Sequence, residues 1–150
     1  MFYQPTPTRH ICDFIGRNAP DKNDALSDLG SGRGHVPLLA ANCTGARCIG
    51  NEGGVAYEGC VERCARALNL RRVEFLRQDA RLADLSAGNV FYLYITFTGA
   101  MLHDVLNRLK VEAAKRPIPF ARWALARHRR REALAGSPRQ STKRSACALS

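Results

Sequence analysis

Three glycines at alternate positions, Gly30, Gly32 and Gly34, form the stretch of this sequence whose residue types are best suited to binding a ligand. They follow an apolar run at 25–29, which predicts a strand, and precede a second apolar run at 36–41, which predicts a helix. Glycine permits a tight turn and leaves no Cβ between the backbone and a ligand, and a helix N-terminus presents free N–H groups. A strand, a glycine turn and a helix in this order predict a site for a nucleotide-like ligand.

The spacing of these glycines distinguishes two classes of nucleotide-binding turn. The dinucleotide fingerprint G-x-G-x-x-G would need a glycine at position 35, which is His35. The pattern present is D-x-G-x-G-x-G, in which Asp28 stands two residues before Gly30. A plain turn between a strand and a helix is the alternative interpretation, and the rest of the chain must decide between the two.

Two further acids follow strands that the sequence predicts. Residues 47–50 predict a second strand, and Glu52 follows it, where a carboxylate can accept hydrogen bonds from both hydroxyls of a ribose. Residues 73–76 predict a third strand, after which come Asp79 and Ala80. The alternative interpretations are a solvated glutamate in a turn and an aspartate that caps a turn or helix.

Hydrophobic periodicity predicts the other elements. A helix is expected from Thr6, as its N-cap, to about residue 18, and an apolar stripe at 57–68 predicts another. Residues 90–94 are apolar throughout, as in a central parallel strand, and residues 101–109 form an amphipathic helix with Arg108 away from its apolar face. We therefore expect a Rossmann-like, doubly wound α/β fold with about four parallel strands in the order 3-2-1-4.

The length and the charge of the chain restrict its organisation. A chain of 150 residues predicts one domain with a real core, and no apolar run reaches the ~18 residues of a membrane span. No signal peptide is visible, so a cytoplasmic location is expected. The net charge of +10 divides into +3 for residues 1–116 and +7 for residues 117–150. The basic cluster at Arg127, Arg129, Arg130 and Arg131 would suit nucleic acid or an acidic membrane, and a solvated, disordered end is the simpler interpretation.

The six cysteines of the sequence include no C-x-x-C pair, so their spacing does not favour a metal site. Cys60 and Cys64 lie one helical turn apart on the stripe at 57–68. We expect buried, reduced thiols and no bound metal.

Four segments in the order DLGSGRG, CIGNE, FLRQDA and NVFYLYITF resemble those of class I S-adenosylmethionine (SAM) dependent methyltransferases, over about residues 3–116. The segments Gln4–Pro7 and Phe91–Tyr94 are similar to those of bacterial relatives of the non-SET histone-lysine methyltransferases. The resemblance implies that SAM is the cofactor and that the chain transfers its methyl group to an acceptor.

The resemblance also assigns roles to the acids. Asp28 would face the positively charged methionine end of SAM. Because SAM has no phosphate group, an acid beside the glycine turn would not repel it. Glu52 would bind the ribose, and Asp79 the adenine amino group, while the small Ala80 lets the ring lie flat. The implied cofactor-binding residues are Asp28, Gly30, Ser31, Gly32, Gly34, Glu52, Asp79 and Ala80.

The methyl acceptor and the catalytic residues are not assigned by the sequence. Tyr94 and Thr96 are weak candidates for lining the acceptor site, and His35 and His103 are weaker ones. Methyl transfer from a sulfonium depends chiefly on alignment with the acceptor, so no general base is obligatory.

Three departures from the pattern accompany the resemblance. Gly53 and Gly54 follow Glu52 where a helix start is usual, and no proline stands in the loop after residue 94. The full family sheet has seven strands, yet no strand-rich segment follows Pro117. We therefore expect an incomplete SAM-binding domain at 1–116 and a basic, partly disordered tail at 117–150, with a truncation or frame shift near residue 117. A short helix is predicted at 120–134.

Two other function classes remain open on the sequence. An inactive remnant or a basic nucleic-acid-binding module would explain the missing strands. A nicotinamide-dependent oxidoreductase is disfavoured by His35, which replaces the third glycine of the dinucleotide fingerprint.

Overall fold

Five parallel strands form a single sheet at the centre of the molecule, in the order β3-β2-β1-β4-β5. The computed structural model describes residues 5–54, 59–94, 98–116, 118 and 123–126. The strands are β1 (Ala25–Leu29), β2 (Arg47–Glu52), β3 (Val73–Arg77), β4 (Val90–Tyr94) and β5 (Trp123–Ala126). The predicted order 3-2-1-4 and the Rossmann-like α/β class are confirmed.

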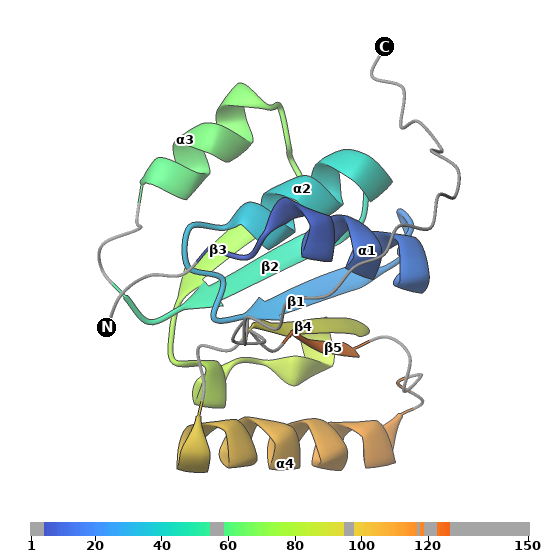
Figure 1. The fold of residues 1–150 in the computed structure, drawn as a ribbon, viewed down its shortest axis with the longest axis vertical. Coiled ribbons are helices and arrows are strands. Elements are labelled where there is room, and N and C mark those ends of the chain that lie inside the picture. Colours follow the sequence, from blue (N-terminus) through green and yellow to red (C-terminus); the bar gives the residue numbers. More distant parts are fainter. Residues whose placement is uncertain (1–4, 55–58, 95–97, 117, 119–122, 127–150) are drawn as a thin grey trace, which may run out of the picture.

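Helices cover both faces of this sheet (Figure 1). The first three lie on one face: α1 (Thr8–Asn18), α2 (His35–Thr44) and α3 (Cys60–Ala67). The other face carries α4 (Gly99–Lys115) and two short 3₁₀ turns, η2 (Ala80–Leu82) and η3 (Leu85–Ala87). The arrangement follows from crossovers between parallel strands, which place helices against the sheet.

The fifth strand was not predicted. Trp123–Ala126 pairs in parallel with β4, with Trp123 in register with Phe91, so the helix expected at 120–134 is wrong for these four residues. The outer edge of β4 presents free N–H and C=O groups, and pairing with them overrides the helix propensity of alanine and leucine. One segment of the predicted tail at 117–150 is thus a strand of the sheet. The basic cluster at 127–131 lies outside the described residues.

Separate apolar cores lie on the two faces of the sheet. On one face, Ile11 and Phe14 of α1 pack with Tyr92 of β4, and the rings of Phe14 and Tyr92 meet edge to face with centroids 4.9 Å apart. On the other face, Leu93 of β4 packs with Val105 of α4. The helix predicted around residues 101–109 therefore buries its apolar side as expected. Arg108, which was predicted to lie away from that side, is instead half-buried and donates to carbonyls of the η2 turn.

Two local predictions are wrong. Helix α1 begins at Thr8 with Pro7 as its N-cap, one residue after the predicted cap, because proline suits the start of a helix. In α3 the side chains that are buried are Val61 and Ala65, whereas Cys60 and Cys64 are exposed. The buried stripe is displaced by one position, which turns the thiols away from the sheet.

The described cysteines are all free thiols, and among them Cys48 is buried while Cys12, Cys43, Cys60 and Cys64 are exposed. Within the described part of the chain, no group of three or more His, Cys, Asp or Glu side chains could hold a metal ion. None of its helices is long and apolar enough to cross a membrane.

Candidate functional site

The glycine turn after β1 has a left-handed backbone at all three glycines. The φ angles are 88° at Gly30, 52° at Gly32 and 70° at Gly34, which side chains with a Cβ rarely adopt. The N–H groups of Gly30 and Ser31 donate to the carbonyl of Asn51, at 2.8 and 2.9 Å. The turn is therefore folded onto the carboxyl end of β2, as the predicted site requires.

The Phe75 ring packs against the backbone of two glycines, Gly34 at the end of this turn and Gly50 in β2. A Cβ at Gly34 would lie 2.6 Å from the Phe75 ring, and a Cβ at Gly50 would lie 2.7 Å from it and 2.9 Å from Ser31 Oγ. No larger residue fits at either position unless the ring moves. Gly50 was not among the predicted site residues, although a glycine inside a strand is a known sign of close backbone approach.

A cavity of about 350 Å³ opens between the glycine turn, the ends of β2 and β3, and the start of α3. Its walls are formed by Ser31, Gly32, Gly50, Glu52, Gly54, Gly59, Val61, Glu62, Phe75, Leu76 and Arg77. Ser31 is only 8% exposed, and its hydroxyl has no hydrogen-bond partner among the described residues. A buried hydroxyl without a partner is costly, so this group is suited to bonding a ligand.

Glu52 holds the backbone on both sides of the cavity. Its Oε2 accepts the N–H of Gly32 at 2.9 Å, and its Oε1 accepts the N–H of Gly54 at 2.8 Å. A carboxylate has about four acceptor sites, so both oxygens can still accept from a ribose. The ribose role of Glu52 stays a prediction, and its position in the cavity wall agrees with it.

Asp28 lies in β1, in register with Gly50 of β2, and is only 2% exposed. It is not among the described residues that line the cavity, whereas its neighbour in register, Gly50, is. Burial raises the pKa of Asp28 well above its ordinary value, and the nearby charge of Glu52 raises it further. Two neighbouring carboxyl groups create a site that favours a positive charge or a proton. The resemblance places the positively charged end of SAM beside Asp28, and this role stays a prediction.

The third acid, Asp79, lies on the loop after β3. It is the N-cap of η2, and its carboxylate forms an ion pair with Arg81 at 2.7 Å. Hydrogen bonds from Arg81 lower the pKa of Asp79 to about 2. Asp79 and Ala80 are not among the described residues that line the cavity, so the predicted adenine contact would lie beside it.

A buried amide joins the three strand ends. Asn51 is 2% exposed, donates to Ser27 Oγ at 3.2 Å and accepts from the Gln78 side chain at 2.5 Å. The Gln78 N–H also donates to the carbonyl of Glu52 at 3.2 Å. The segments that carry Asp28, Glu52 and Asp79 therefore meet at one edge of the sheet. Asn51 could not be recognised from the sequence, because its partners are more than twenty residues away.

The acceptor candidates are less well defined. Tyr94 is the last residue of β4, and Thr96 lies outside the described residues. His35 is the first residue of α2, next to the glycine turn, and His103 lies on the exposed side of α4 within reach of Asn107. No acceptor site is assigned by these positions.

The comparisons with known proteins give structural neighbours alone. No protein-family model matches the sequence, and no curated protein matches it. An RNA methyltransferase from Salinibacter ruber, in complex with S-adenosyl-L-homocysteine, is 29% identical with a TM-score of 0.59, over 81% of this chain and 72% of that chain.

Two further neighbours have a lower sequence identity to this chain. A precorrin-6y C5,15-methyltransferase from Geobacter metallireducens GS-15 is 17% identical with a TM-score of 0.62, over 71% of this chain and 57% of that one. A SAM-dependent methyltransferase from Thiobacillus denitrificans, in complex with S-adenosyl-L-homocysteine, is 19% identical with a TM-score of 0.60, over 71% of this chain and 45% of that one. The chain thus has the Rossmann-like fold of class I SAM-dependent methyltransferases.

Proposed function

We propose that this chain binds SAM and is a SAM-dependent methyltransferase. The observation that carries the proposal is the bond between Glu52 and Gly32, which joins the end of β2 to a D-x-G-x-G-x-G turn beside a cavity of about 350 Å³. The Salinibacter ruber RNA methyltransferase, which is 29% identical, has S-adenosyl-L-homocysteine bound and supports the same assignment.

The residues present fit SAM in charge and in shape. The acid pair Asp28 and Glu52 suits a ligand with a positive sulfonium and ammonium, and the buried Ser31 hydroxyl offers a further hydrogen bond. The turn glycines leave room for the ligand close to the backbone. SAM would supply an activated methyl group, and the chain would supply orientation, which accounts for much of the rate of such displacements.

The acceptor class is open. The similarity to non-SET histone-lysine methyltransferases depends on two short segments, Gln4–Pro7 and Phe91–Tyr94, and none of the structural neighbours described above is of that type. The RNA substrate named for the Salinibacter ruber neighbour makes RNA the first acceptor to test. A role for Arg127, Arg129, Arg130 and Arg131 in nucleic-acid contact is part of this proposal.

The proposal is tested by ligand binding to the purified chain. SAM and S-adenosylhomocysteine should raise its melting temperature and bind in calorimetry, because a ligand of the native state stabilises it, whereas NAD should do neither. Binding of NAD in place of SAM would overturn the proposal in favour of an oxidoreductase.

Activity is tested separately with SAM that carries a labelled methyl group. The chain is incubated with RNA, with protein and with small-molecule extracts, and label should enter one of these pools. If SAM binds and no pool is labelled, the chain is a cofactor-binding remnant and not an enzyme.

A further inference from the structure

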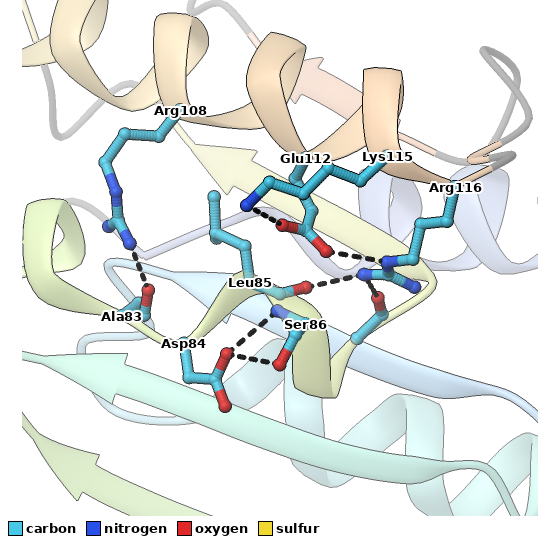
Figure 2. Close-up of polar contacts among 9 residues, drawn as sticks. Ala83, Asp84, Leu85, Ser86, Arg108, Glu112, Lys115 and Arg116 are labelled. Atoms are coloured by element: carbon cyan, nitrogen blue, oxygen red, sulfur yellow. Dashed lines mark hydrogen bonds and ion pairs between the residues drawn. The ribbon is translucent and has the colours of Figure 1, made fainter.

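Arg108 of α4 reaches across to the loop that follows β3. Its Nη2 donates to the carbonyl of Ala83 at 2.8 Å, as Figure 2 shows. Its Nη1 donates to the carbonyls of Arg81 and, at 3.5 Å, of Ala80. One guanidinium thus binds three carbonyls of a single turn, η2 and the residue after it.

These contacts are strong and specific to arginine. A guanidinium presents five N–H donors in a rigid plane, and hydrogen bonds from a charged donor are stronger than neutral ones. Ala80 and Ala83 are 4% and 0% exposed, so Arg108 binds a turn whose small apolar side chains are buried. The turn is therefore held by α4 as well as by its small apolar side chains.

The turn that Arg108 holds carries the predicted adenine-binding residues. Asp79 is its N-cap and Ala80 its first residue. The Asp79 carboxylate is in turn held by Arg81, whose Nη2 donates to it at 2.7 Å. Because Arg108 binds the carbonyl of the same Arg81, the position of the turn that carries Asp79 depends on α4.

We infer that Arg108 is a positioning residue for adenine recognition, which holds Asp79 and Ala80 where they select the adenine amino group. The inference rests on the proposed function. An Asp79 carboxylate accepts a hydrogen bond from the amino group of adenine and repels the carbonyl that replaces it in hypoxanthine. A ligand with adenosine is thus preferred to one with inosine only while the carboxylate is held in place.

Arg116, the residue directly after α4, provides a matched control. Its Nη2 donates to the carbonyls of Leu85 and Gly88, at 2.6 and 2.5 Å, and its Nε pairs with Glu112 (Figure 2). It therefore binds η3 as Arg108 binds η2, but it does not contact the turn that begins at Asp79. Loss of either arginine should reduce stability, and only loss of Arg108 should alter adenine selection.

The experiment compares the affinities for S-adenosylhomocysteine and S-inosylhomocysteine by calorimetry. The wild type should prefer the adenosine ligand about tenfold or more, and Asp79→Asn should abolish that preference. Arg108→Lys keeps the charge but cannot span three carbonyls, so its preference should approach that of Asp79→Asn. Arg116→Lys should keep the wild-type preference.

The outcomes separate the inference from the proposed function. If Asp79→Asn loses the preference and Arg108→Lys keeps it, Arg108 has no positioning role. If the wild type binds neither ligand, the proposed function fails and the inference fails with it. Urea unfolding reports whether each variant folds. If Arg108→Lys does not fold, the ratio of the two affinities is measured on Arg108→Gln, whose uncharged side-chain amide is too short to bind all three carbonyls.

Discussion

The Glu52 carboxylate accepts the backbone N–H of Gly32 at 2.9 Å, so the last residue of β2 fixes the middle of the turn that follows β1. Twenty residues separate the two along the chain. The same carboxylate accepts the N–H of Gly54, so Glu52 connects the glycine turn to the segment that follows β2.

Glu52→Gln should weaken binding of S-adenosylhomocysteine roughly 10- to 100-fold, because one charged acceptor is replaced by an amide that cannot accept from two N–H groups and a ribose. Calorimetry measures the loss. Glu74→Gln is the control: Glu74 lies on β3, is half exposed and pairs with Arg47 at 3.2 Å. Equal affinities for Glu52→Gln and Glu74→Gln would remove Glu52 from the binding site.

Gly50→Ala should lower the free energy of unfolding by about 1–3 kcal/mol, since the new Cβ overlaps the Phe75 ring at 2.7 Å. Gly16→Ala should instead raise it by roughly 0.5–1 kcal/mol, because Gly16 lies within α1 and nothing stands within 4 Å of its Cβ position. Urea unfolding of the two variants gives both numbers. A stable Gly50→Ala would mean that the Phe75 ring can move aside.

The surroundings of Gly50 show which parts of the site could be predicted from the sequence and which could not. The strands around the site were predictable because each is a short apolar run, and the D-x-G-x-G-x-G spacing marked the turn. Gly50 and Asn51 escaped notice because their importance comes from Phe75 and Gln78, which lie on another strand or loop.

The wrong predictions have the same origin. The orientation of α3 differs by one residue from the pattern of its apolar side chains, which exposes Cys60 and Cys64. The strand at Trp123–Ala126 depends on an open edge of β4, and the contacts of Arg108 depend on carbonyls that no sequence pattern records. The other strands and helices follow from local sequence patterns, whereas these features follow from tertiary contacts.

Stability should depend on pH through Asp28. Burial raises its pKa well above the ordinary value of 3.8, so the folded chain keeps a proton that the unfolded chain loses. Wild-type stability should therefore fall as the pH rises from the unfolded pKa through the folded pKa, by at most about 1.4 kcal/mol per pH unit. Asp28→Asn should lack this fall. Urea unfolding between about pH 3 and pH 9 compares the stability of the wild type with that of Asp28→Asn. If stability depends on pH in the same way in both, the raised pKa of Asp28 is contradicted.

Binding of SAM should release a proton from Asp28, because a positive charge beside the carboxyl group favours its ionised form. Calorimetry in two buffers of different ionisation enthalpy measures the release. The Asp28→Asn variant should bind SAM more weakly than the wild type and release fewer protons on binding. Proton release that Asp28→Asn leaves unchanged would have to come from another group.

Thiol labelling should separate the cysteines by burial. Cys12, Cys43, Cys60 and Cys64 are exposed and should react with iodoacetamide in the folded chain, whereas burial raises the pKa of Cys48 to about 12 and keeps it protonated. Peptide mapping by mass spectrometry identifies the labelled sites. Rapid modification of Cys48 without denaturant would show that β2 opens in the native state.

The hydrogen bonds of Asn51 to Ser27 and Gln78 join β1, β2 and the loop after β3 from inside the sheet, in addition to the backbone pairing of the strands. The lengths of the connecting helices then have little effect on the geometry of the cavity. A protein built in this way can gain or lose residues in its crossovers while the same few side chains stay at the same separations.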